Sequence, residues 1–181
     1  AADGQPLTTA KLQSAAIVFD QLRTTNPISP EMTVYPISGL NAINPEIYQK
    51  AVDLNTSLNT VSTQGIAALT GNLPVLPIQE KTQLMSAEKK TLAPQGIVGV
   101  RFLTAFDDAA TGVTGTNLVY AFQGITADST NYISVLFPIT HSMLTAPVPN
   151  PAEYNWAALP EDGWTPRLSD LDQIIESITV R

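Results

Sequence analysis

One histidine and a few carboxylates are the residues in this chain that could carry acid–base chemistry. His141 follows an apolar segment and precedes Ser142, so a Ser-His-acid triad would have to use it. The chain contains no Gly-x-Ser-x-Gly sequence, the motif that places a nucleophilic serine on a tight turn. We therefore expect no catalytic residue, and we expect His141 to lie at a strand end with a hydrogen bond to the backbone. The alternative is a hydrolase that combines carboxylates with His141.

Acidic side chains could also form a calcium site. Asp107, Asp108 and Asp128 would have to converge at loop ends to supply oxygen ligands. The Asp-x-Asp-x-Asp-Gly spacing of a calcium loop is absent, which favours solvated turn carboxylates. With no cysteine and one histidine, the chain cannot form a thiolate or multi-histidine site by itself. We expect no metal and no cofactor, and we expect EDTA to leave the melting temperature unchanged.

Five positions, His141 among them, are candidates for ligand binding. A buried arginine in an apolar strand needs a carboxylate or carbonyl partner, or else an anionic ligand, and the structural pairing is favoured. Aromatic side chains with a polar group are common at interfaces, but near the C-terminus they could equally anchor short helices. The candidate binding residues are Arg101, His141, Tyr154, Trp156 and Trp164.

Composition limits the class of partner. The formal net charge is −7, and the nine lysines and arginines are scattered, whereas a nucleic-acid binder usually carries a basic stripe. No apolar run approaches the roughly 18 residues of a membrane span. An apolar content of 44% favours a packed core over disorder. We therefore expect a protein, small-molecule or glycan ligand, no nucleic acid, and no transmembrane segment in this chain.

Three apolar segments form the expected centre of the fold. Residues 96–104, 118–123 and 132–139 alternate with period two, which predicts neighbouring antiparallel strands. Both faces of the first segment are apolar, so we expect it to be central. Further strands are expected at 15–20, 31–37 and 84–92, and 73–78 reads as an extended connector because of its two prolines.

Helices are indicated by capping signals and apolar spacing. Asn44-Pro45 predicts a helix to about residue 59, and Asn150-Pro151 predicts a short one to about residue 159. Thr165 should cap a last helix, with Pro166 in its first turn. An apolar stripe should bury that helix on the sheet, while Asp172 should face water. The stripe consists of Leu168, Leu171, Ile175 and Ile178.

These elements predict an α+β fold, an antiparallel sheet with helices packed on one face and a C-terminal amphipathic helix. We expect residues 1–11 to be a flexible lead-in and residues 12–181 to be a single α+β domain. Ala1-Ala2-Asp3-Gly4 has neither the charged nor the apolar region of a signal peptide. The Thr, Asn, Gln, Ala and Pro richness is typical of exported proteins, so we expect an exported protein whose signal peptide is not part of this chain.

The order of several motifs resembles an uncharacterised family of exported bacterial proteins, many of them predicted lipoproteins. The motifs are Val18-Phe19-Asp20, Val34-Tyr35-Pro36, Asn44-Pro45, Leu73-Pro74-Val75-Leu76-Pro77 and the segments 99–104, 120–126, 132–135 and 171–178. The hairpin and terminal helix are also similar to PsbP and Mog1 α+β folds. These resemblances imply a non-catalytic binding or assembly module of the cell envelope, which is periplasmic, extracellular or lipid-anchored at the cell surface.

Overall fold

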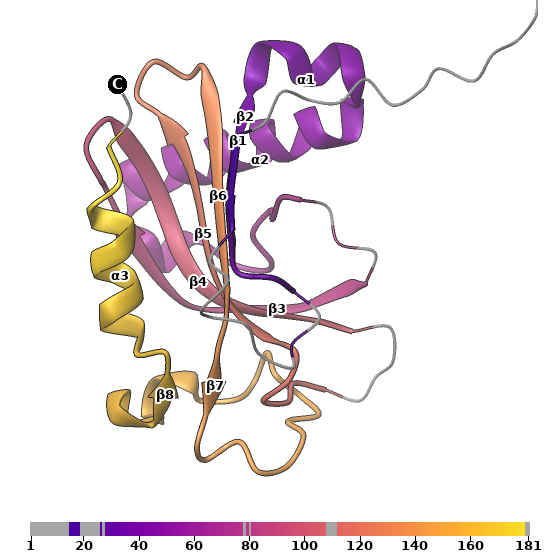
Figure 1. Cartoon of the computed structure of the whole chain (residues 1–181), viewed down its shortest axis with the longest axis vertical. Helices are drawn as coiled ribbons and strands as arrows, with labels where there is room; N and C mark the ends of the chain where they lie inside the picture. Colours follow the sequence, from indigo (N-terminus) through magenta and orange to yellow (C-terminus); the bar gives the residue numbers. More distant parts are fainter. Residues whose placement is uncertain are drawn as a thin grey trace, which may run out of the picture.

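A six-stranded antiparallel sheet forms the centre of the protein (Figure 1). The computed structural model describes residues 15–18, 26, 28–77, 79, 81–107 and 112–179. The expected lead-in, Asp108 and residues 180–181 lie outside these ranges. The strand order is β1-β2-β6-β5-β4-β3. The strands are β1 (Ala15–Val18), β2 (Glu31–Pro36), β3 (Thr82–Leu92), β4 (Ile97–Asp107), β5 (Leu118–Thr126) and β6 (Asn131–Pro138).

The three central strands predicted from the apolar segments are confirmed. β4 pairs with β5, with Arg101 opposite Phe122, and β5 pairs with β6, with Phe122 opposite Val135. Both faces of these strands are buried, as expected for strands covered on two sides. The turn between β5 and β6 is shorter than the sequence indicated, because β5 continues to Thr126 and β6 starts at Asn131.

Helices cover both faces of the sheet, whereas one covered face was expected. The side chains of Ala51, Leu54 and Leu58 from α2 join the cluster of Val100 and Phe102. Side chains of α3 belong to a second cluster, which contains alternate residues of the same strands. Figure 1 shows α3 on one side of the sheet and the α1–α2 pair on the other. The α+β class is therefore confirmed, with a core on each side of the sheet. The helices are α1 (Ile37–Ile43), α2 (Pro45–Gln64) and α3 (Leu168–Glu176).

α2 begins where its capping signal predicts. The Asn44 side chain accepts hydrogen bonds from the backbone N–H groups of Glu46 (3.0 Å) and Ile47 (3.3 Å), and Pro45 occupies the first turn. The helix continues past residue 59 to Gln64 and ends at Gly65, whose φ of 84° suits glycine. Ser and Thr hydroxyls along the helix bond to carbonyls four residues earlier, so these polar side chains are accommodated without breaking it.

The connector after α2 forms neither helix nor strand over its described residues 73–77, and it is buried against the sheet. Ile78, the last residue of the predicted connector, lies outside the described residues. The Leu76 backbone N–H donates to Gln123 Oε1 (3.2 Å), and the Ser134 hydroxyl donates to the Leu76 carbonyl. Gln123 Nε2 in turn donates to Ser134 Oγ (2.9 Å), and the Tyr132 hydroxyl donates to Gln123 Oε1 (2.6 Å). This closed network satisfies polar groups that would be costly to bury alone, and it fixes the connector to β5 and β6.

The predicted start of the C-terminal helix is wrong, and its apolar stripe is confirmed at three of four positions, because Ile178 lies beyond the helix end at Glu176 and is half-buried. Thr165 belongs to β8 (Trp164–Thr165), which pairs with β7 (Thr140–His141), and α3 begins at Leu168. The Glu161 carboxylate caps the helix instead, accepting from the Ser169 N–H at 2.8 Å. Leu168, Leu171 and Ile175 are buried. The short helix predicted after Asn150 does not form. Between Asn150 and β8 the chain contains only the 3-10 turns Trp156–Ala158 and Glu161–Gly163.

Candidate functional site

Arg101 is paired structurally, as the sequence favoured. Its guanidinium donates from Nε to Asp172 Oδ1 (3.0 Å) and from Nη2 to Asp172 Oδ2 (3.2 Å). Nη1 donates to the Glu88 carbonyl (2.7 Å), where β3 bulges away from β4. The guanidinium also lies 5.8 Å from the centre of the Tyr120 ring. These contacts use the donors of Arg101, so its charge is compensated within the fold.

The expectation that Asp172 faces water is wrong. It is 6% exposed, and besides Arg101 it accepts hydrogen bonds from Lys90 Nζ (2.7 Å) and the Tyr120 hydroxyl (2.9 Å). Burial, the largest single effect, acts to raise the pKa of Asp172, but the hydrogen bonds from Arg101, Lys90 and Tyr120 and the Arg101 charge together lower it. The ionised carboxylate therefore joins α3 to β3, β4 and β5.

His141 is enclosed at the end of β7. The Met143 backbone N–H donates to Nδ1 (3.2 Å), so Nε2 carries the proton and donates to the Pro160 carbonyl (3.0 Å). The ring packs edge-on against Trp164 with centroids 4.6 Å apart, and Gly163 lies so close that a Cβ there would overlap the imidazole. His141 is 2% exposed and makes the backbone hydrogen bonds that the sequence favoured.

The C-terminal aromatic residues lie mainly in the interior. Trp156 and Trp164 are buried in the cluster that contains the stripe of α3. The Trp156 indole donates to the Pro151 carbonyl (2.8 Å), and its ring lies 4.8 Å from that of Tyr154, which is half-buried. Four of the five candidate binding residues thus form two aromatic pairs, and the fifth, Arg101, forms an ion pair with Asp172. None of the five lines the four surface depressions described among the residues that the structure places.

The carboxylates proposed as calcium ligands do not converge. Asp107 ends β4, and Asp128 follows the end of β5, which runs antiparallel to β4. The paired part of β4, from Ile97 to Ala105, is about 27 Å long at ~3.4 Å per residue, and the two carboxylates lie beyond its opposite ends. Asp128 accepts from the Thr126 and Thr130 hydroxyls and the Thr130 N–H; the Thr126 bond is the leading cause that lowers its pKa. Within the described residues, no group of three potential metal ligands occurs.

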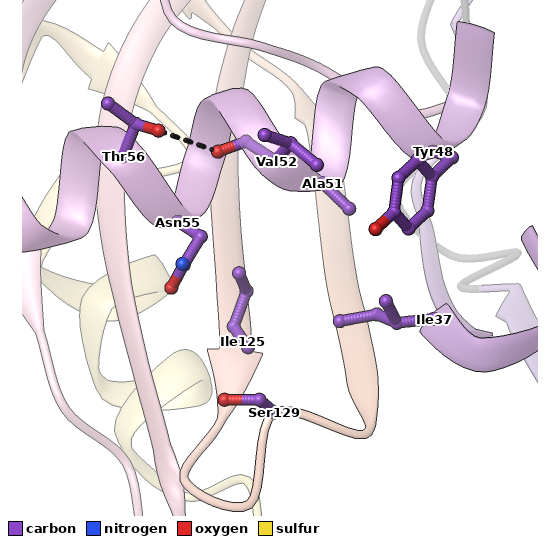
Figure 2. Close-up of a pocket in the computed structure, with 8 residues that line it drawn as sticks. All are labelled: Ile37, Tyr48, Ala51, Val52, Asn55, Thr56, Ile125 and Ser129. Carbon is purple, nitrogen blue, oxygen red and sulfur yellow. Dashed lines mark hydrogen bonds between the residues drawn. The ribbon is translucent and has the colours of Figure 1, made fainter. Parts of the chain in front are cut away.

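A two-part groove along α2 is the candidate site that the described residues offer. One depression, of about 190 Å³, lies between α2, the start of α1 and the β5–β6 turn (Figure 2). A second, of about 240 Å³, continues along α2 towards β4. Both include Asn55, Ile125 and Ser129, so the depressions adjoin. The first is lined by Ile37, Tyr48, Ala51, Val52, Asn55, Thr56, Ile125 and Ser129; the second adds Leu58, Asn59, Ser62, Val98, Thr126 and Ala127.

The groove combines an apolar floor with free polar groups. Val52 and Val98 are 38% and 45% exposed, which is unusual among the large apolar side chains of this protein. Figure 2 shows the Asn55 carboxamide pointing from α2 towards Ile125 and Ser129. In the part of the chain that the structure describes, the side chains of Asn55 and Asn59 make no hydrogen bond, whereas the Thr56 hydroxyl donates to the Val52 carbonyl (3.0 Å). The lining contains no charged side chain.

The sequence reasoning missed this groove. Its signal is a stripe at helical spacing, since the positions on α2 that line the groove follow one another at four, three, four and three residues. In the sequence, such a stripe cannot be distinguished from an ordinary solvent-exposed helix face. Its role becomes visible only when the helix is placed over one end of the sheet. The stripe consists of Tyr48, Val52, Asn55, Asn59 and Ser62.

No protein-family model, no curated protein and no solved structure matches this chain. Among the helices that the structure describes, none is both long and apolar enough to cross a membrane.

Proposed function

We propose that this protein is a non-catalytic binding or assembly module of an exported, envelope-associated bacterial protein, and that it binds its ligand in the groove along α2. The observation that carries the proposal is the uncharged two-part groove with unpaired carboxamides at its edge. Sites of this kind, mostly apolar with a few placed polar groups, are the usual form of ligand pockets.

The environment of the titratable side chains supports binding over hydrolysis. A general base must reach its substrate and be able to exchange a proton. His141 is enclosed, and both of its nitrogens are occupied by backbone groups. Asp172 is held by three side chains. Asp107 and Asp128 lie at opposite ends of the sheet, and none of the four lines the groove.

The cellular setting in this proposal comes from the sequence. A chain rich in Thr, Asn, Gln, Ala and Pro, with a resemblance to exported bacterial proteins, favours a periplasmic, extracellular or lipid-anchored location. Fractionation of the native organism with an antibody against this chain tests it. Recovery of the protein in the cytoplasmic fraction would contradict this part of the proposal.

Ligand-dependent stabilisation tests the groove itself. A ligand present at 100 times its Kd adds about 2.7 kcal/mol, which corresponds to a rise in melting temperature of roughly 5–10 °C for a protein of this size. The full chain is screened against blocked neutral peptides, neutral oligosaccharides and inorganic phosphate. Stabilisation should disappear in Val52→Arg, which fills the groove, and persist in Thr63→Arg, which adds the same charge to the same helix. A ligand that stabilises wild type and Val52→Arg equally would place the site elsewhere.

A further inference from the structure

We infer that the groove takes an extended, uncharged peptide segment of a partner protein, whose backbone is held by Asn55 and Asn59 and whose alternate side chains enter the two depressions. This inference rests on the proposed function, because it names the ligand class for the same groove.

The length of the groove suits a short extended peptide. From Tyr48 to Ser62 the stripe on α2 is about 21 Å long, at 1.5 Å per residue. An extended chain advances about 3.3 Å per residue, so six or seven residues would span the same length. The two depressions adjoin along this line, and the ligand can therefore lie parallel to α2.

The two free carboxamides match the repeat of an extended backbone. Asn55 and Asn59 are one helical turn apart, about 6 Å along the axis, and two residues of extended chain cover about 6.6 Å. A carboxamide carries a donor and an acceptor, so each can pair with both the N–H and the C=O of one residue of the extended chain, which point to the same side. Neither side chain has a hydrogen-bond partner within the described residues, and each is available for such a pair.

The depressions provide places for alternate side chains. Residues on one side of an extended chain are separated by two positions, which is the spacing already set by the carboxamides. Ile37 and Ala51 line the first depression, and Leu58 and Val98 line the second, with Ile125 in both. Volumes of about 190 and 240 Å³ give each depression room for one aliphatic or aromatic side chain. Specificity would come from these two positions and affinity from the backbone pairs, as in other modes of extended-peptide recognition.

The charge distribution favours a neutral segment. The protein carries a net charge of −7, yet neither depression is lined by a charged side chain. Of the nearby acids, Asp53 accepts a hydrogen bond from Gln49 (2.8 Å), and Asp128 is bonded within its own turn. A charged ligand group placed in the groove would lose water without gaining an ionic partner among the side chains that line it.

Selection from a random library tests this inference. Phage-displayed random heptapeptides are selected on the immobilised full chain, and enriched sequences are synthesised with both termini blocked. We expect uncharged sequences with apolar residues at alternate positions. In calorimetric titrations, Asn55→Ala/Asn59→Ala should weaken binding at least tenfold and Val52→Arg should abolish it. Thr63→Ala should bind as wild type does, and matching melting temperatures of the variants would exclude loss of folding.

The outcomes separate this inference from the proposed function. Peptides that lose affinity in Val52→Arg but not in the double variant would overturn backbone recognition and leave the groove as a site. Neutral oligosaccharides that bind in the groove while heptapeptides do not would likewise overturn the inference and support the proposed function. A dimer in sedimentation that Val52→Arg dissociates would identify a second copy as the occupant and overturn it. If neither probe class binds and the chain stays monomeric, both proposals fail.

Discussion

The ion pair beneath α3 offers a direct test of how the terminal helix is held. Asp172 accepts two hydrogen bonds from Arg101 and one each from Lys90 and Tyr120. Asp172→Ala removes all four and leaves the Arg101 guanidinium, which is 8% exposed, without its counter-ion. Removing one partner of a buried ion pair typically costs about 3–5 kcal/mol, a large share of a typical unfolding free energy of about 5–15 kcal/mol. We expect Asp172→Ala to reduce the free energy of unfolding by that amount.

Urea unfolding followed by tryptophan fluorescence measures this loss, because Trp156 and Trp164 are buried in the cluster that α3 helps to form. Asp170→Ala is the matched control, since Asp170 is exposed in the first turn of the same helix and should cost below about 1 kcal/mol. Replacing both partners, as Asp172→Leu with Arg101→Met, should recover much of the loss. If Asp172→Ala were no more destabilising than Asp170→Ala, the burial of Asp172 and its network would be refuted.

Four further predictions concern stability. Ile175→Ala should cost about 2–5 kcal/mol because Ile175 is fully buried, whereas the 38% exposed Ile174 should tolerate alanine; equal small losses in urea would mean that α3 does not pack on the sheet. The lowered pKa of Asp172 adds stability above the ordinary aspartate pKa of about 3.9, and that stability is lost as pH falls through the folded pKa. The difference in unfolding free energy between wild type and Asp172→Asn should therefore shrink towards about pH 2, and a constant difference would contradict the linkage. Gly163→Ala should lower the melting temperature, because its Cβ would overlap the His141 ring; an unchanged value would show that the loop yields. EDTA should leave the melting temperature unchanged, and a drop of several degrees would reveal a structural metal.

Local sequence patterns were sufficient to predict the central strands and the first residue of α2. Alternation in residues 96–104, 118–123 and 132–139 predicted three strands, and the turn-rich loops between them predicted that neighbours pair as hairpins. Asn44 and Pro45 determined where α2 begins, because a capping side chain acts within three residues of itself. Interactions of such short range can be derived from the sequence without knowing the fold.

The predictions for α3 were wrong where a residue more distant in the sequence makes the contact that a local pattern suggested otherwise. Thr165 resembles a cap, but Glu161 in the preceding 3-10 turn satisfies the N-terminus of α3. Asp172 lies beside the apolar stripe, and a helical projection gives no sign that Arg101, 71 positions earlier, occupies the facing strand. The need of Arg101 for a carboxylate was recognisable in the sequence, but which carboxylate it meets depends on the strand order and on α3 crossing that face.

The groove was missed for the same reason. Asn55 and Asn59 read as ordinary exposed residues of a polar helix face. Their surroundings depend on the β5–β6 turn and on Val98 at the start of β4, which α2 reaches only in the folded chain.

The strand order affects how the chain can fold while it is being synthesised. β2 pairs with β6, so residues 31–36 meet residues 131–136. A polypeptide is synthesised from its N-terminus, so β2 is complete long before β6 is. Pairing across such a separation slows folding, and an exposed strand edge invites association with other nascent chains. Until β6 has emerged, the side of β2 that later pairs with it therefore has no strand partner. The groove arises at that same moment, because one of its walls is the turn that leads into β6.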